Sequence, residues 1–269
     1  MNKFAPLPAS EENLKLCFSL MDLTTLRSQD TPSSVEAFVE NVNALPARFP
    51  DFPLPASICV YPNFAGLVRK LLKVSGVKVT AVAGCFPSSQ SFLPVKTMES
   101  RLAVEAGADE IDIVLPLHAY LDGDKAGVTA EIRAQREAVG PKTVLKVILE
   151  TGAMGEDAEL MAGAARIALQ SGADFLKTST GKIPVGATPF AAEVLCRCIR
   201  EHYQRTGKKV GFKAAGGISS AEDALLYLGI VNEILGPQWL TPRLLRLGVS
   251  RLGDSLLSAV KGSEVRYFG

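Results

Sequence analysis

Side chains that commonly bind metals are scarce in this sequence of 269 residues, which contains only two histidines and five cysteines. The histidines, His118 and His202, lie far apart in the chain, and we expect His202 to face solvent from a helix. Cys196 and Cys198 are separated by one residue, a spacing that fits neither a CxxC redox motif nor a zinc pair. The scarcity of imidazoles argues against a zinc-dependent enzyme, and we expect neither a metal nor a cofactor.

Excess charge of either sign is also missing, since 29 Lys and Arg balance 28 Asp and Glu to a formal charge of +1. This balance removes the electrostatic case for nucleic acid or an anionic membrane surface as a partner. No apolar stretch approaches the roughly 18 residues that a membrane helix needs. The odd number of cysteines, without repeated spacing, is typical of a reduced protein, so we expect a cytoplasmic location.

The hydrophobic content of 47% is arranged in a recurring pattern along the chain. Eight apolar, β-branched runs alternate with stretches of helical periodicity, at a spacing of about 32 residues that suits a βαβ unit. These runs are residues 19–26, 56–62, 77–84, 109–116, 143–150, 173–180, 209–217 and 244–250. The pattern favours an α/β fold with a single (β/α)8 TIM barrel, and an open doubly wound sheet is the alternative.

The domain organisation follows from the absence of any linker or shift in composition. We expect one domain over residues 1–269, with a short N-terminal extension at about 1–13. A C-terminal tail at about 261–269 need not pack against the domain and can be flexible. Tyr267 lies in this tail.

Charged residues interrupt the apolar runs near their C-terminal ends, where barrel enzymes place their active residues. They are Asp22, Asp112, Lys146, Lys177 and Lys213. Lysine is depleted in strands and rarely buried without a partner. Structural roles remain open at this point: Lys146 could point outward with its ammonium in water, Asp22 could cap a turn, and Asp112 could form a buried ion pair.

Lys177 and Lys213 are 36 residues apart, about one βα repeat, so adjacent strands would place them at the same height. Two neighbouring ammonium groups in a buried site disfavour the charged form and lower the pKa. A lysine that is a free amine near neutral pH can attack a carbonyl to form a Schiff base. The pair predicts imine chemistry without identifying the nucleophile.

Glycine-rich segments follow the last three predicted strands and suggest a phosphate site. Gly181-Lys182 follows the sixth strand, Gly216-Gly217 the seventh, and Ser250 the eighth. Backbone N–H groups in such loops, at the start of a helix, bind anions. Barrels commonly hold a phosphate after strands seven and eight, so we expect a phosphorylated small molecule as the substrate.

Several segments together resemble the deoxyribose-phosphate aldolase family, from about residue 14 to about residue 260. They are LMDLTTL (20–26), ICVYP (58–62), GADEIDIVLP (107–116), LKVILETG (145–152), GADFLKTSTGK (172–182) and GFKAAGG (211–217). The resemblance implies a class I aldolase that reversibly cleaves 2-deoxy-D-ribose 5-phosphate to D-glyceraldehyde 3-phosphate and acetaldehyde without a metal. It also implies a homodimer. Another imine-forming phosphosugar lyase is the alternative, and a non-catalytic phosphosugar-binding barrel is a weaker one.

The resemblance also assigns roles to the charged residues. Lys177 in FLKTSTGK matches the Schiff-base lysine, and Lys213 in GFKAAGG matches the neighbour that lowers its pKa. Asp112 matches the residue that transfers protons, while Lys146 and Asp22 match polar residues of the same site. The residues expected to bind substrate and phosphate are Thr24, Gly181, Lys182, Gly216, Gly217 and Ser250.

Three positions depart from the family pattern. Arg251 stands where some members have a second serine, and Ala214 stands where some have proline. Some members end in a tyrosine that reaches the site, a role that Tyr267 could fill or not.

Overall fold

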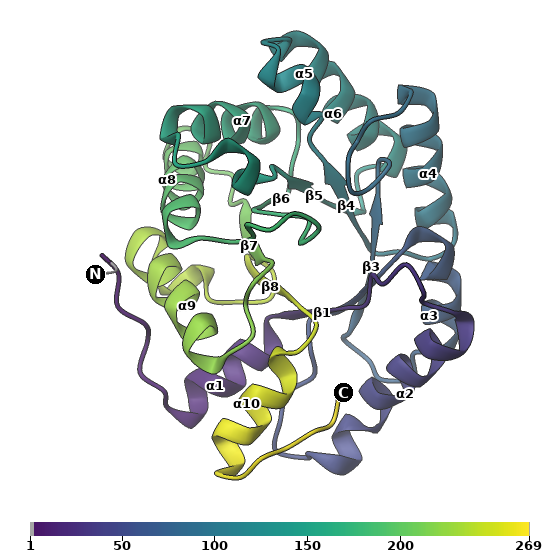
Figure 1. Cartoon of the computed structure of the whole chain (residues 1–269), viewed down its shortest axis with the longest axis vertical. Coiled ribbons are helices and arrows are strands. Elements are labelled where there is room, and N and C mark those ends of the chain that lie inside the picture. The colour runs from purple at the N-terminus through teal and green to yellow at the C-terminus, as the bar shows by residue number, and fades with distance from the viewer. Residues whose placement is uncertain (1–2, 269) are drawn as a thin grey trace.

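The computed structural model describes residues 3–268; Met1, Asn2 and Gly269, which belong to the expected extension and tail, lie outside the described residues. Eight parallel strands form a closed barrel in chain order, with β1 paired to both β2 and β8 (Figure 1). The strands are β1 (Met21–Thr24), β2 (Ser57–Val60), β3 (Lys78–Ala83), β4 (Glu110–Val114), β5 (Val144–Ile148), β6 (Phe175–Lys177), β7 (Gly211–Ala215) and β8 (Leu245–Val249). The closed order confirms the TIM barrel and excludes the open sheet.

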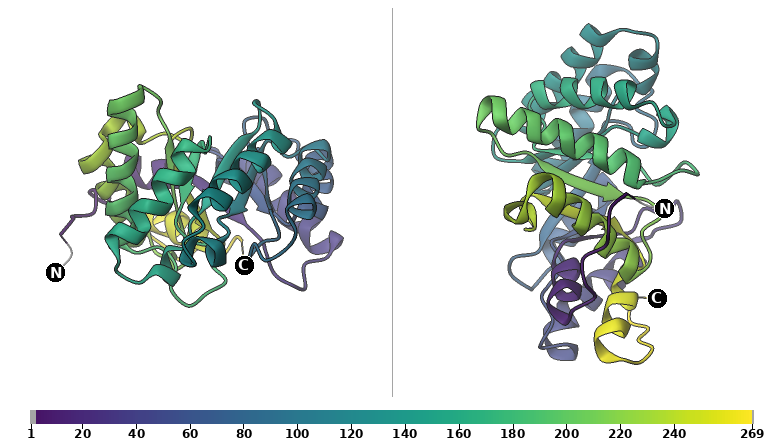
Figure 2. Two further views of the ribbon diagram at one scale, coloured as in Figure 1. Left: turned by 90° about the horizontal axis from the view of Figure 1, so that it is seen from above. Right: turned by 90° about the vertical axis from the view of Figure 1, so that its left-hand side faces the viewer.

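Helices surround the barrel and cover the outer faces of the strands (Figures 1 and 2). They are α1 (Glu11–Ser19), α2 (Pro32–Arg48), α3 (Ala65–Leu71), α4 (Leu93–Glu105), α5 (Leu117–Leu121), α6 (Lys125–Val139), α7 (Ala158–Gln170), α8 (Pro189–Thr206), α9 (Ala221–Leu235) and α10 (Leu252–Lys261), with 3₁₀ turns η1 (Pro62–Phe64), η2 (Thr151–Met154) and η3 (Pro237–Trp239). Thr188 caps α8 ahead of Pro189, and Ser220 caps α9. None of the described helices is long and apolar enough to cross a membrane.

The core lies between the strands and the helices, and it is built by alternation along the strands. Ile111 and Ile113 of β4 are fully buried within the apolar cluster. Asp112 between them points to the opposite side, into the barrel. Strands buried on both faces therefore carry apolar residues outward and polar residues inward.

His202 does not face solvent, so that expectation was wrong. His202 is only 8% exposed, and neither nitrogen of its ring has a hydrogen-bond partner within residues 3–268. The reason is helical spacing: His202 follows Cys198 by four residues on the inner face of α8, where Leu195 and Ile199 are also buried. Burial lowers the pKa of His202.

Both terminal segments pack against the barrel. In the N-terminal segment, the Leu7 N–H donates to the Leu225 carbonyl of α9 at 3.0 Å. In the tail, Tyr267 donates a hydrogen bond to the Asn41 carbonyl of α2 at 2.6 Å, and its backbone N–H donates to Asp254. The tail up to Phe268 is thus held in place, and Tyr267 lies among the outer helices rather than at the barrel mouth.

Candidate active site

The five charged residues expected at the site come together inside the barrel. Strand register places Lys177 of β6 beside Lys213 of β7, and Asp112 of β4 beside Lys146 of β5. Asp22 of β1 completes the group, and none of the five is more than 3% exposed. The outward direction considered for Lys146 and the turn-capping role considered for Asp22 are therefore excluded.

Asp112 is the centre of this cluster. Its Oδ2 accepts from the Nζ of Lys177 and from the Nζ of Lys213, each at 2.8 Å. Its Oδ1 accepts from the Nζ of Lys146 at 2.9 Å. Although burial raises the pKa of Asp112, the three lysines outweigh it and hold that pKa well below its usual value.

The two paired lysines have opposite pKa shifts. Burial lowers the pKa of Lys177, and the neighbouring charge of Lys213 lowers it further against the opposing effect of Asp112. Burial also disfavours the charge on Lys213, but Asp112 and Asp22 outweigh it and raise the pKa. Asp22 makes the difference, because its Oδ2 lies 2.5 Å from the Nζ of Lys213. Lys177 is therefore the residue of the pair that loses its proton more readily.

Two further charged residues, which were not predicted from the sequence, join the cluster. Arg246 of β8 binds both carboxylate oxygens of Glu110, at 3.0 and 2.7 Å, and also contacts Asp22. Glu110 lies 2.6 Å from the Nζ of Lys146. Both residues break apolar runs, which is the feature that singled out the lysines, and Glu110 lies two residues from Asp112 on the same face of β4.

A cavity of about 350 Å³ opens at the mouth above Lys177. All six residues expected to bind substrate and phosphate line it, together with Arg27 and Arg251. The full lining is Thr24, Thr25, Leu26, Arg27, Lys177, Thr180, Gly181, Lys182, Ala215, Gly216, Gly217, Ile218, Gly248, Val249, Ser250 and Arg251. Among residues 3–268 no acidic side chain lines it, and Arg27, Lys182 and Arg251 supply three basic side chains besides Lys177, so the cavity favours an anion.

The loops around this cavity approach one another closely. Gly216 has a φ of +84°, and a Cβ there would lie 3.0 Å from the Cα of Gly186. Lys182 reaches across the mouth, and its Nζ donates to the Leu26 carbonyl in the loop after β1. The loop that carries Lys182 is anchored by Glu150, which precedes η2 after the end of β5. Glu150 accepts from the Thr180 hydroxyl at 2.5 Å and from the Thr180 N–H at 3.1 Å.

The arrangement supports covalent chemistry on a carbonyl. A buried amine with a lowered pKa faces a carboxylate that can transfer protons, and Lys213, whose pKa is raised, lies beside them. Within the described part of the chain, no group of three or more His, Cys, Asp and Glu side chains is placed to hold a metal ion.

Comparisons with known proteins extend over nearly the whole chain. A family model described as DeoC/LacD family aldolase matches residues 17–228. A deoxyribose-phosphate aldolase of Agrobacterium fabrum is 38% identical over 259 residues, covering 96% of this chain and 95% of that protein. The structure of a deoxyribose phosphate aldolase from Aeropyrum pernix, which is described as a unique tetrameric structure, is 26% identical in sequence. It superimposes with a TM-score of 0.68 and covers 93% of this chain and 98% of the Aeropyrum chain. A Toxoplasma gondii structure with 24% identity, covering 94% and 95% of the two chains, shares the fold at a TM-score of 0.81.

Proposed function

The chain belongs to the DeoC/LacD family of aldolases, and from this membership we propose that it reversibly cleaves 2-deoxy-D-ribose 5-phosphate to D-glyceraldehyde 3-phosphate and acetaldehyde. The observation that carries the proposal is the position of Lys177. Its amine is buried, has a lowered pKa and contacts Asp112 at 2.8 Å. It also lines a cavity whose charged side chains, among the described residues, are all Lys or Arg.

In the proposed mechanism, the Nζ of Lys177 attacks C1 of the open-chain aldehyde to form a carbinolamine. Loss of water then gives a protonated imine, which accepts the electron pair when the C2–C3 bond breaks. The C3 hydroxyl loses its proton and becomes the aldehyde of glyceraldehyde 3-phosphate. The remaining two-carbon enamine is protonated at C2 and hydrolysed, which releases acetaldehyde and restores the amine.

Asp112 is placed to transfer the protons of these steps, since it contacts the amine directly. Lys213 and Lys146 hold its carboxylate in position at 2.8 and 2.9 Å. Lys213 also adds the positive charge that favours the neutral form of Lys177, and Asp22 keeps Lys213 charged.

The phosphate is assigned to the far side of the cavity, where the loops after β6, β7 and β8 meet. Gly181, Gly216 and Gly217 would donate backbone N–H groups, and Ser250 lies just before the first turn of α10. Lys182 supplies a cation, and Thr24 lines the β1 side. A dianionic phosphate matches the charge of this lining.

The proposal is tested by incubating the protein with 2-deoxy-D-ribose 5-phosphate and measuring acetaldehyde and glyceraldehyde 3-phosphate. Equal amounts of the two products are expected, with much weaker turnover of unphosphorylated 2-deoxyribose. Cleavage of a different phosphosugar, with none of this one, would favour the alternative lyase. Ligand binding without cleavage of any phosphosugar would favour a binding protein.

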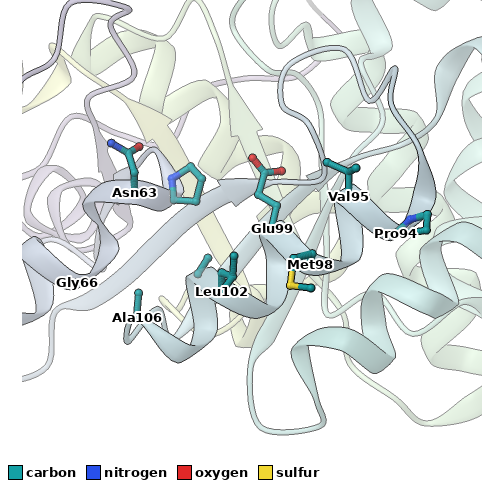
Figure 3. A pocket seen from close by; sticks show the side chains of 10 residues that line it. Asn63, Gly66, Pro94, Val95, Met98, Glu99, Leu102 and Ala106 are labelled. Carbon is teal, nitrogen blue, oxygen red and sulfur yellow. The ribbon is translucent and has the colours of Figure 1, made fainter.

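We also propose that a second copy of the chain covers the exposed face of α4, as the family resemblance implies a homodimer. Figure 3 shows Val95, Met98 and Leu102 along one side of this helix, opposite Asn63 and Gly66. These three apolar side chains belong to residues that are 45 to 53% exposed, and they line a cavity of about 760 Å³. In the described part of the chain, Glu99 is the one charged residue of the lining, so two copies can meet there with little like-charge repulsion.

A cytoplasmic location remains part of the proposal. All five cysteines are free thiols, four of them buried, which suits a reducing compartment. Cell fractionation with an antibody to the chain tests this point.

A further inference from the structure

The charged cluster inside the barrel has two layers. The upper layer contains Lys177 and Lys213 around Asp112, next to the cavity. The lower layer contains Glu110 and Arg246, which form a two-point ion pair at 3.0 and 2.7 Å. The residues of both layers are at most 5% exposed, so bulk water does not screen their charges from one another.

Direct contacts connect the two layers along two paths. On one path, Arg246 contacts Oδ1 of Asp22, whose Oδ2 contacts Lys213 at 2.5 Å. On the other path, Glu110 contacts Lys146 at 2.6 Å, and Lys146 contacts Asp112 at 2.9 Å. Glu110 therefore acts directly, and Arg246 acts through Asp22, on a lysine that contacts Asp112, the carboxylate partner of Lys177.

The net formal charge of the cluster depends on whether Lys177 is protonated. The carboxylates are Asp22, Glu110 and Asp112, and the cations are Lys146, Lys213 and Arg246, with Lys177 as the remaining basic group. With three negative and three positive charges fixed, the cluster is neutral when Lys177 is a free amine and carries +1 when it is protonated. Excess charge in a buried cluster is unfavourable, so the neutral amine is favoured.

We propose that Glu110 and Arg246 are positioning residues that set this charge balance, so that Lys177 is the group that releases its proton. The inference rests on the proposed function, in which Lys177 forms the imine. Neither residue lines the cavity, so neither is assigned contact with the substrate.

The groups that face Lys177 do not change this conclusion, and the charge balance of the cluster remains the main influence on the protonation of Lys177. Asp112 contacts it from β4, Lys213 lies beside it on β7, and Cys59 approaches from β2. Burial raises the pKa of the Cys59 thiol, so this group contributes no charge near neutral pH. Lys146 on β5 acts through Asp112, which both lysines contact.

The experiment measures borohydride trapping of acetaldehyde on Lys177 as a function of pH, for the full chain and its variants. Glu110→Gln removes a negative charge, and the pH at half-maximal trapping is expected to fall by roughly one unit. Arg246→Met removes a positive charge, and the midpoint is expected to rise by roughly one unit. The double variant restores the balance and returns the midpoint close to the wild-type value.

Opposite shifts are the decisive feature, because general loosening of the barrel would move both midpoints in the same direction or leave them unchanged. Arg246→Lys keeps the charge and serves as the matched control, with a midpoint near that of the wild type. Loosening that admits water would raise the midpoint, because burial lowers the pKa of Lys177. A fall in Glu110→Gln therefore supports the inference even if Arg246→Met does not fold. Unchanged or same-direction midpoints overturn the inference, whereas absence of any adduct on Lys177 in the wild type overturns the proposed function instead.

Discussion

Lys177 and Lys213 share one acceptor: the Nζ atoms of both lie 2.8 Å from the same Oδ2 of Asp112. They occupy paired positions on adjacent strands. Their pKa values nevertheless shift in opposite directions, because Lys213 has a second carboxylate partner in Asp22, whereas Lys177 has only Asp112 among the described residues. The additional carboxylate favours the charged form of Lys213, while burial and the charge of Lys213 favour the neutral amine of Lys177.

This relationship predicts the effect of Lys213→Leu. Removing its positive charge favours the protonated form of Lys177, so the pH at half-maximal imine formation should rise by roughly one unit or more. The measurement is the rate of borohydride trapping against pH. Lys213→Arg retains the cation and should move the midpoint much less. A midpoint that stays in place or falls in the Leu variant contradicts the assigned role.

Gly217→Ala tests the phosphate site against a matched control. Gly217 has a φ of +83°, and Gly207 has a φ of +72°. A Cβ at either position would meet no atom of residues 3–268 within 4 Å. Both alanine variants should lose about 1 kcal/mol of stability from the strained backbone. Only Gly217 lines the cavity, so only its variant should raise KM for the phosphorylated substrate. Equal KM changes in the two variants would place the phosphate elsewhere.

Asp22→Asn tests the contribution of the buried ion pairs to stability. The variant leaves Arg246 and Lys213 without this carboxylate, and we expect a loss of about 3 kcal/mol in the free energy of unfolding at pH 7. Arg246, Lys213 and Lys146 outweigh burial and hold the pKa of Asp22 well below its usual value. Its stabilisation is therefore complete above the unfolded pKa of about 4 and decreases as the pH falls below it.

The measurement for Asp22→Asn is urea unfolding at pH 7 and at pH 3. The difference between wild type and variant should narrow at the lower pH. The exposed Asp51, changed to Asn, should alter stability by less than about 0.5 kcal/mol at either pH. A difference that widens toward pH 3 would contradict the assigned ion pairs.

Met98→Glu tests the proposed homodimer. A carboxylate on the apolar face of α4 should repel its copy across a two-fold contact and yield monomers, as measured by size-exclusion chromatography with light scattering. Leu121→Glu on α5 is the control, since Leu121 is 53% exposed and lies outside the α4 face. A monomeric wild type, or dimers that persist in the Met98 variant, would exclude this face as the dimer contact.

The strands of the barrel could be predicted from the sequence, because a strand covered on both faces reads as a continuous apolar run. A charged residue within such a run is conspicuous, which is why Lys146, Lys177 and Lys213 were found. Arg246 has the same property in LLRLGVS but lies at the second residue of β8. Arg246 therefore does not fit the pattern of charges near the carboxyl ends of strands, and the closed barrel brings it to Asp22 and Glu110.

Other features depend on contacts between distant segments and could not be predicted from local pattern. The contact of Lys182 with the Leu26 carbonyl joins residues 156 positions apart, and the loop path that permits it is set by the closed barrel. The prediction that His202 faces solvent was wrong because it relied on the charged and polar residues next to it in the sequence. Residues three and four positions away, which share a side of the helix, determine whether that side is buried.

The central claim is that Lys177 forms the Schiff base, and mass spectrometry after borohydride reduction tests it most directly. Incubation with acetaldehyde and borohydride, followed by peptide analysis, should show an increase equal to a reduced two-carbon adduct on the peptide that contains Lys177. Lys177→Leu should show no such adduct and lose turnover by at least about 10³-fold, while Lys78→Leu, at the opposite end of the barrel, should resemble the wild type. No adduct in the wild type, or an adduct only on Lys213, would contradict the account.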